Sequence, residues 1–304
     1  MHCLLCKSEN TTAVRTLLAT NLIADWRAAY HLDITSELEG QDQLQLYRCD
    51  SCGLQFFHPA LAGSDQLYEK LEEFDWYYLP RKWEYDAALE DLRAGERLLE
   101  IGSGRGDFVA LAESLKQVEA TGLELNTRAI SFAQRAGRPV YRRSLQELSE
   151  EQSESFDAVC GFQVLEHIPD PECFIADCLN MLKPGGRLLL SVPDSEGFLR
   201  HVENHLLDQP PHHVSLWSSR VFEYLPSRFP LKIESIRFEP LMDYHLDWYG
   251  DIQLNRLPRL RLLSGLAYRL THKLVLPLLR RTGLHHYLRG HTIYVCCTKL
   301  EGLS

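Results

Sequence analysis

The 304-residue chain lacks long apolar runs, low-complexity stretches and an excess of basic residues. No run reaches the roughly 18–20 apolar residues of a membrane span, and the N-terminus has no signal-peptide core. An apolar content of 45% argues against disorder. The 32 basic residues are outnumbered by 42 acidic ones, and the net charge of −10 disfavours a broad nucleic-acid-binding surface. We therefore expect a soluble, cytoplasmic, enzyme-sized protein.

Cysteine is the one metal-ligating residue with a clear pattern. Nine cysteines without a secretory signal argue for reduced thiols rather than a disulfide framework. Two CxxC pairs, Cys3/Cys6 and Cys49/Cys52, can present four thiolates, the closed tetrahedral shell of a structural Zn²⁺ ion. Two unrelated pairs of buried or redox-active thiols are the alternative. The expected result is a zinc-binding module at the N-terminus.

Composition and periodicity divide the rest of the chain. An aromatic, helical pattern runs from Leu67 to about Leu92, and short β-like runs then alternate with helical ones, as in parallel α/β sheets. The predicted strands are Arg97–Ile101, Val118–Glu124, a short one near Pro139–Arg142, Phe156–Phe162, Arg187–Val192, Lys232–Phe238 and Thr292–Lys299. The predicted divisions are a zinc-binding module (1–60), a core (61–240), a basic helical insertion (241–290) and the last strand of the core (291–304).

A glycine-rich turn follows the first of these strands. Gly102, Gly104 and Gly106 alternate with other residues, and backbone without Cβ lets a nucleotide-like ligand cross the strand end. Glu100 stands just before them, where a carboxylate can face the cationic end of a ligand. Glu124 ends the next strand, placed to accept both hydroxyls of a ribose. The spacing differs from the G-x-G-x-x-G that favours a pyrophosphate, so nicotinamide binding is the weaker alternative.

This glycine segment resembles the first motif of class I S-adenosylmethionine-dependent methyltransferases, and later segments follow in that family's order. Gly122–Asn126 is similar to the second motif, Phe156–Pro171 to the fourth-strand motif and Leu182–Pro193 to the turn into strand five. The resemblance covers residues 67–240 and 292–299. It implies an α/β fold with a Rossmann-like seven-stranded sheet, preceded by the zinc module and interrupted by the helical insertion before the last strand.

The resemblance also implies a site for S-adenosylmethionine. Glu124 should bind the ribose, and Leu125 should flank the adenine. Ser144 should approach the adenine edge, although it replaces the acidic residue often found there, and Phe162 and Gln163 should line the mouth beside the methyl donor. The implied cofactor-binding residues are Glu100, Gly102, Ser103, Gly104, Gly106, Glu124, Leu125, Ser144, Leu145, Phe162 and Gln163. The aromatic segment with Tyr77, Tyr78 and Trp83 resembles the family's lid, with ordinary packing as the alternative.

Histidines are the candidates for activating a methyl acceptor. Transfer needs an in-line nucleophile, and a neutral hydroxyl also needs a base. His167 follows the fourth strand and is either catalytic or a structural residue at a helix start. His212 and His213 follow a Pro-Pro step, with Trp217 beyond, which suits an acid/base or sugar-stacking platform; a solvent-facing turn is the alternative. We hypothesise that His212 or His213 deprotonates a sugar hydroxyl.

The four-cysteine module together with the Pro-Pro-His-His loop resembles bacterial methyltransferases of sugar and polysaccharide pathways. This implies a saccharide or other small acceptor. The long deoxysugar C-methyltransferases carry a further C-terminal domain that this chain lacks, so we expect methylation of oxygen, with carbon as the alternative. Base methylation is disfavoured, since the fourth strand ends in Gly-Phe-Gln-Val. An alternative of another class is a zinc-ribbon interaction protein on a catalytically idle fold.

The insertion has an unusual charge. Residues 252–300 contain nine Lys/Arg and no acidic residue, with leucines at near-helical intervals over 257–288. Pro258 and Pro277 are expected to bound two helices. A basic amphipathic helix can lie on an anionic membrane, which here would be the inner face. A helical cap over the active-site mouth, or an oligomer surface, is the alternative.

Overall fold

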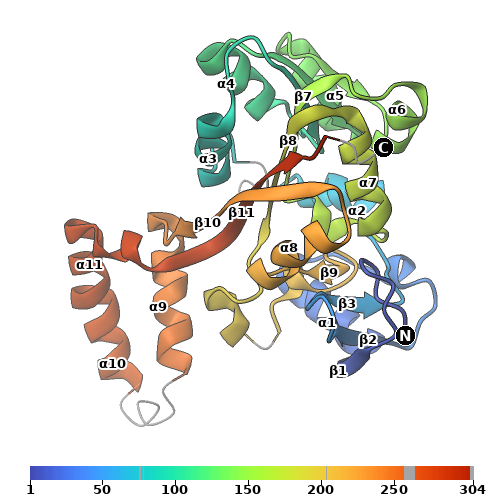
Figure 1. Ribbon diagram of the computed structural model, residues 1–304. Coiled ribbons are helices and arrows are strands. Elements are labelled where there is room, and N and C mark those ends of the chain that lie inside the picture. Colours follow the sequence, from blue (N-terminus) through green and yellow to red (C-terminus); the bar gives the residue numbers. More distant parts are fainter. Residues whose placement is uncertain (75–76, 78, 203, 257–263, 302–304) are drawn as a thin grey trace.

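The computed structural model describes the chain except for residues 75–76, 78, 203, 257–263 and 302–304. Its described residues form two sheets (Figure 1). The larger has seven strands in the order β10-β11-β8-β7-β4-β5-β6, and the smaller has four in the order β1-β2-β3-β9. The expected α/β architecture, with a seven-stranded sheet beside a small N-terminal unit, is confirmed.

The seven-stranded sheet has five neighbouring parallel strands and an antiparallel edge. Strand β11 runs antiparallel to both β8 and β10. All seven predicted strands are present, and the largest change is that β8 starts at Leu182 rather than Arg187. The strands are β4 (Arg97–Ile101), β5 (Glu119–Glu124), β6 (Val140–Arg142), β7 (Phe156–Phe162), β8 (Leu182–Pro193), β10 (Leu231–Pro240) and β11 (Arg289–Lys299).

Helices cover both faces of this sheet, which explains why its strands are almost wholly apolar. Leu98 packs with α3 (Trp83–Asp91) and α4 (Asp107–Lys116) on one face. Its neighbour Leu99 belongs to the core on the opposite face, because successive side chains of a strand alternate. The helices that contribute to that second core are α6 (Leu145–Glu151), α7 (Pro171–Met181) and α8 (Ser219–Tyr224). Helix α5 (Thr127–Arg135) packs beside β6.

The smaller sheet joins the N-terminus to a distant part of the chain. Its strands are β1 (Thr11–Leu18), β2 (Gln43–Cys49), β3 (Gln55–His58) and β9 (Ser215–Leu216), with α1 (Ala19–Tyr30) packed on it. Strand β9 comes from the loop after β8, and Phe56 pairs with Ser215. The backbone N–H of Phe57 also donates to the carbonyl of Val214, at 2.9 Å. The N-terminal sheet therefore holds the loop that carries the paired histidines.

The aromatic segment from Leu67 to about Leu92, where a helical pattern was predicted, contains two helices. Helix α2 (Asp65–Leu71) ends well before α3 begins at Trp83. Pro80 lies between them, and proline both lacks an amide donor and disfavours helical backbone at the preceding residue. Between the two helices, Tyr77, Leu79 and Lys82 line a cavity.

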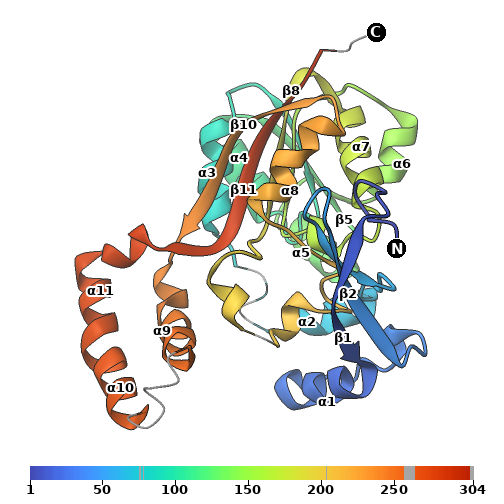
Figure 2. The ribbon, with the colours of Figure 1, turned by 60° about the horizontal axis from the view of Figure 1, so that its bottom comes forward.

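The insertion forms a helical hairpin that stands apart from the sheets in both views (Figures 1 and 2). It contains α9 (Leu246–Asn255), α10 (Ser264–Leu270) and α11 (Leu276–Thr282). A π-helical turn, Thr271–Val275, joins α10 directly to α11, so the prediction that Pro277 separates two helices is wrong. The wider turn accommodates the missing amide of proline. Pro258 lies outside the described residues. Within the described part, no helix has the length and apolarity needed to cross a bilayer.

Candidate active site

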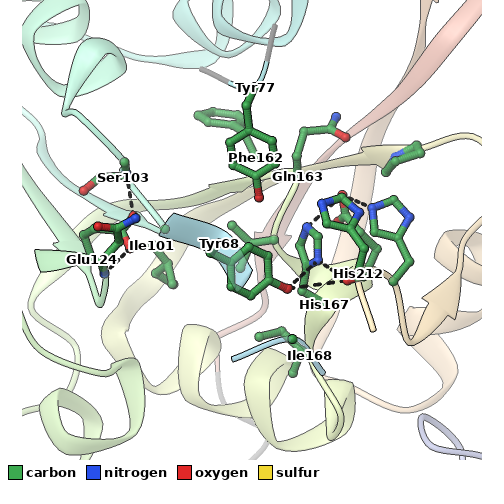
Figure 3. Close-up of a pocket in the computed structure, with 18 of the residues that line it drawn as sticks. Tyr68, Tyr77, Ile101, Ser103, Glu124, Phe162, Gln163, His167, Ile168 and His212 are labelled. Carbon is green, nitrogen blue, oxygen red and sulfur yellow. Dashed lines mark hydrogen bonds and ion pairs between the residues drawn. The ribbon is translucent and has the colours of Figure 1, made fainter. Parts of the chain in front are cut away.

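One large cavity of about 1190 Å³ opens at the carboxyl ends of β4, β5, β7 and β8. A single small-molecule site usually measures roughly 300–1000 Å³, so this cavity has room for two ligands. Figure 3 shows Ser103 and Glu124 on one side and His167 and His212 on the other, with Phe162 and Gln163 between them. We call these two sides the glycine end and the histidine end.

The glycine end begins with the turn between β4 and α4. Gly102, Gly104 and Gly106 have φ angles of +67°, +52° and +70°, a region that residues with a Cβ rarely adopt. A Cβ on Gly102 would also lie 2.5 Å from a methyl carbon of Val164. Gly102, Ser103 and Gly104 line the cavity, whereas Gly106 lies behind them as the N-cap of α4. Glycine at these positions therefore allows the positive φ angles of the turn and also leaves space for a ligand beside its backbone.

Glu124 is fixed at the end of β5 by backbone amides. One carboxylate oxygen accepts from the N–H of Gly104 at 2.7 Å, and the other accepts from Leu125 and Asn126 at 2.7 and 2.9 Å. A carboxylate has about four acceptor positions, so capacity remains for a ligand. Glu124 lines the cavity, and this arrangement can bind a pair of hydroxyl groups.

Glu100 lies behind the cavity wall rather than on it. The side chain is only 2% exposed, and its Oε2 atom has no hydrogen-bond partner. Burial raises the pKa of Glu100 well above its usual value. Buried polar atoms are normally hydrogen-bonded, so this orphan oxygen can interact with a cationic group on a ligand.

The other predicted cofactor residues all line the cavity. Ser144 caps α6 by accepting from the backbone N–H of Glu147, which gives it a structural role as well. Leu145 is buried and Leu125 is half-exposed. Phe162 packs edge-on against Phe108. Gln163 has a φ of +57°, unusual for a residue other than glycine, at the point where the glycine end meets the histidine end.

Three imidazoles meet at the histidine end. The ring centroids of His167, His212 and His213 lie 4.5–4.8 Å apart. The Nδ1 atom of His167 is 2.5 Å from the carbonyl oxygen of His212, and that of His212 is 2.9 Å from the carbonyl oxygen of Leu207. The Nδ1 atom of His213 is 3.3 Å from the Asp208 carboxylate. Each Nδ1 faces an oxygen acceptor, and this favours the tautomer with the hydrogen on Nδ1 and the lone pair on Nε2.

Glu166 and Asp208 flank these rings, and their pKa values are shifted in opposite directions. Burial lowers the pKa of His167 to about 3 and that of His212 well below its usual value, so both rings are neutral. Burial raises the pKa of Glu166, which is 1% exposed, to about 8. Burial also opposes ionisation of Asp208, but hydrogen bonds from His205 and His213 outweigh it and lower the Asp208 pKa.

The alternative of a solvent-facing turn at the paired histidines is wrong. His212 and His213 are buried, because β9, which follows them in the chain, pairs with β3 of the smaller sheet. The expectation that Trp217 offers a stacking platform beside them also fails. Trp217 is fully buried, packs against Phe222 and donates its indole N–H to Ser215. Trp217 therefore belongs to the core.

The four N-terminal cysteines converge, as expected. Their sulfur atoms all lie within 4.8 Å of one another, with Cys3–Cys52 at 3.6 Å and Cys6–Cys49 at 3.5 Å. Tetrahedral Zn–S bonds of about 2.3 Å would place sulfurs about 3.8 Å apart. The Cys52 thiol, and then the backbone amides of Cys6 and Leu5, lower the pKa of the Cys3 thiol to about 5. This donor set fits a tetrahedral metal ion.

Comparison with known families agrees with this geometry. Residues 76–235, just over half of the chain, match the family model described as a methyltransferase domain. The chain belongs to the methyltransferase domain family. The matched region contains the glycine end and all three histidines, His167, His212 and His213, but not the four cysteines.

Relatives of this methyltransferase-family chain include ubiquinone biosynthesis O-methyltransferases. The protein from Xanthomonas oryzae pv. oryzae (strain PXO99A) is 39% identical over 120 residues, which cover 37% of this chain and 48% of the relative. The protein from Dechloromonas aromatica (strain RCB) is 35% identical over 104 residues, which cover 32% and 44%. This chain thus matches about half the length of these relatives.

Among solved structures, a methyltransferase from Thermotoga maritima, described as a possible histamine N-methyltransferase, is 18% identical. It has a TM-score of 0.49 over 77% of this chain and 97% of that chain.

The structure adds residues to this methyltransferase site that sequence reasoning had not assigned. Tyr68 places its hydroxyl 3.1 Å from Nδ1 of His167, while Glu166 and Asp208 flank the imidazoles. Glu166 and Asp208 are close in sequence to the predicted histidines, and this proximity was sufficient to predict them as site residues. Of the predicted lid residues, Tyr77 lines the cavity, Trp83 packs against the sheet core and Tyr78 lies outside the described residues.

Proposed function

We propose that this protein transfers the methyl group of S-adenosylmethionine to a hydroxyl of a saccharide or another small acceptor. The observation that carries the proposal is the single cavity that joins a glycine turn and Glu124 to a cluster of imidazoles and carboxylates. Two ligands fit within it, one at each end. Proximity of two bound reactants supplies much of the rate enhancement of such a transfer.

The glycine end has the features that this cofactor needs. S-adenosylmethionine supplies an electrophilic methyl carbon bound to a sulfonium. Glu124 accepts the ribose hydroxyls, while Leu125 and Leu145 enclose the adenine. Ser103 and the glycine backbone would run along the methionine part, with the buried carboxyl group of Glu100 behind them.

The histidine end receives the acceptor. As the acceptor oxygen bonds to the methyl carbon, the carbon–sulfur bond breaks and its electron pair stays on sulfur. The hydroxyl proton is lost at the histidine end. Of the two histidines hypothesised as bases, His213 is favoured over His212 because its Nδ1 faces the Asp208 carboxylate, whereas that of His212 faces only a carbonyl.

Two observations favour an oxygen acceptor. The histidine end is lined by groups that hydrogen-bond, such as Glu166 and His213, which suits a hydroxylated molecule better than an apolar one. The curated relatives are O-methyltransferases by name. The specific assignment to saccharides rests on the sequence resemblance alone. Methylation of carbon, or an idle fold that serves as an interaction module, are the alternatives to be tested.

We also propose that the four-cysteine cluster binds a structural Zn²⁺ ion. With all four positions held by thiolates, no position is left for water or substrate. The cluster lies in the same apolar core as Trp217 and Phe222, next to the strand that carries the histidine loop. Its role is to fix the histidine end.

Calorimetric titration of the purified protein with S-adenosylmethionine and, separately, with NAD tests the cofactor. Micromolar binding of the former alone is expected, and no binding of either would contradict the proposal. Candidate sugars, nucleotide sugars and glycans are then screened for methylation. Replacing both His212 and His213 by alanine should abolish turnover without abolishing cofactor binding. Turnover that persists while substrate still binds would refute the hypothesis of a histidine base.

The projecting hairpin is proposed to contact an anionic membrane surface. Helices α10 and α11 expose Leu266, Leu274 and Leu278 at about 60% each, beside cationic residues such as Lys273 and Arg281. Apolar side chains next to cationic ones suit the boundary between acyl chains and anionic headgroups. None of the described residues of α10 and α11 lines the cavity, which argues against a cap over the mouth.

Sedimentation with vesicles tests this contact. Binding is expected to vesicles that contain anionic lipid and to fall on addition of salt. The double variant Leu274→Asp and Leu278→Asp should lose it. Leu115→Asp, an exposed leucine on α4, is the matched control. No binding to anionic vesicles, or dimerisation through the same leucines, would exclude the membrane.

A further inference from the structure

The three imidazoles at the histidine end are oriented in the same way, with an oxygen acceptor opposite each Nδ1 atom. Each Nδ1 atom points to an acceptor: the carbonyl of His212, the carbonyl of Leu207 or the carboxylate of Asp208. Each ring therefore keeps its Nε2 lone pair. Among these, Nε2 of His212 is buried and has no hydrogen-bond partner.

The carboxyl group of Glu166 lies near the Nε2 atoms of His167 and His213. Glu166 is 1% exposed, and neither of its oxygens has a hydrogen-bond partner. Its Oε1 atom lies 3.9 Å from Nε2 of His167 and 3.9 Å from Nε2 of His213, too far for hydrogen bonds. In the described part of the chain, no Lys or Arg forms an ion pair with Glu166. A buried carboxyl group without a hydrogen-bond partner is costly unless a ligand interacts with its oxygens.

We propose that His167, His212 and His213, through their Nε2 atoms, and Glu166 bind a divalent transition-metal ion. Two ligands with bonds of about 2.1 Å can lie up to about 4.2 Å apart on one ion, and the two distances of 3.9 Å fall within that limit. One ring nitrogen from each histidine lies within 4.8 Å of the others, so small side-chain movements complete the shell.

The surroundings of the rings are those of metal ligands. A histidine that binds a metal usually donates its other N–H to a carbonyl or carboxylate, which orients the ring and selects the tautomer. The rings of His167 and His212 each have a backbone carbonyl in this position, and Nδ1 of His213 lies 3.3 Å from the Asp208 carboxylate. Neutral imidazoles with one carboxylate suit zinc, iron, nickel or cobalt rather than magnesium or calcium. The site is separate from the four-cysteine cluster in ligands and in place.

The proposed ion deepens the proposed function and rests on it. An ion that takes five or six ligands would keep a position for the acceptor oxygen beside these four side chains. A metal ion can lower the pKa of bound water from 15.7 to about 7, and it acts on a hydroxyl in the same way. The proton is released to solvent and the metal does not change oxidation state. No single imidazole then needs to act as the base.

Cobalt titration of the metal-free full-length protein tests the site directly, because Co²⁺ absorbs differently with thiolate and with nitrogen/oxygen ligands. The wild type should bind two ions, one of each type. His212→Gln and Glu166→Gln should each weaken the nitrogen/oxygen site by at least about 100-fold, more than the loss of an outer hydrogen bond costs, and leave the thiolate site intact. His286→Gln, an exposed histidine outside the cluster, should bind as the wild type does.

Titration of S-adenosylmethionine into the same variants separates the possible failures. Retained cofactor binding shows that each variant is folded. If the wild type binds only the thiolate-type ion yet methylates its acceptor, the metal inference is wrong and the proposed function stands. If the second ion binds but the cofactor does not, the metal site stands and the proposed function fails. Equal cobalt binding in wild type and both variants would overturn the inference.

Discussion

The two ends of the cavity are built in different ways. The glycine end comes from consecutive β–α units between Glu100 and Leu145, and backbone amides and glycine conformations define its shape. The histidine end is assembled from Tyr68, from the end of β7 and from the loop that ends in β9. Its shape depends on side chains that meet only after the chain has folded.

This contrast explains which end needs external support. The glycine end lies on β4 and β5, inner strands of the seven-stranded sheet whose residues are mostly buried. The histidine loop is attached to the N-terminal sheet by β9, and that sheet carries the four cysteines. A loop fixed by a small metal-dependent unit can vary with the acceptor without disturbing the cofactor site. The variants below separate the two ends.

The largest expected effect follows removal of the N-terminal metal. The double variant Cys49→Ser and Cys52→Ser should lose the ion, whose binding is worth about 10–16 kcal/mol in small zinc modules. Thermal unfolding should begin at a lower temperature, and acceptor turnover should fall much further than cofactor affinity, because β9 loses its partner strand. Metal analysis, calorimetry and a turnover assay check this. The exposed Cys173→Ser is the control, and equal losses at both ends would refute the contrast.

At the glycine end, Glu124→Gln removes the charged acceptor at the end of β5. A hydrogen bond to a charged group contributes roughly 1.5–3 kcal/mol, so the Kd for S-adenosylmethionine should rise about 10–150-fold. Turnover at saturating cofactor should change little. Glu119→Gln, exposed at the start of the same strand, should leave the Kd unchanged. A fall in kcat without a change in Kd would place Glu124 with the chemistry instead.

At the histidine end, Asp208→Asn should lower turnover by about 10–100-fold, the usual effect of losing the carboxylate that orients a functional histidine. The Kd for S-adenosylmethionine should stay the same, because Asp208 lies away from the glycine turn. Asp251→Asn is a matched control: Asp251 also pairs with a histidine, His272, at 2.8 Å, but on the hairpin. Equal effects of the two substitutions would refute a specific role for Asp208.

The smallest expected effect is on the free energy of unfolding, and it separates two reasons why a position requires glycine: a positive φ and a lack of space for a Cβ. Gly102→Ala should lower the free energy of unfolding by about 1–3 kcal/mol, because its φ is positive and its Cβ would contact Val164. Gly95→Ala has a similar φ of +79° but open space around the Cβ, so it should cost about 1 kcal/mol. Denaturant unfolding measures both. Equal losses would show that packing at Gly102 contributes nothing.

Local pattern was enough to predict much of this protein. The strand Phe156–Phe162 and the turn with Gly102, Gly104 and Gly106 are found where the sequence placed them, because apolar runs and glycine conformations are local properties. Glu124 was predictable for the same reason, since it ends a strand next to the glycine turn. The CxxC spacing likewise indicated the metal cluster, as each pair is a local knuckle.

Other features depended on contacts between distant segments. No local pattern predicts that Trp217 lies in the core rather than at the surface, or that Glu166 lies between His167 and His213.

The seven-stranded sheet, the glycine turn and the pairing of the cysteines are encoded locally, because they follow from periodicity, backbone preference and ligand spacing. The histidine end depends on contacts between segments that are far apart in the chain. Strand β9 pairs with β3 across more than 150 residues of chain, and this pairing brings His212 and His213 to His167. Burial and charge at that meeting point depend on distant neighbours, which no local pattern encodes.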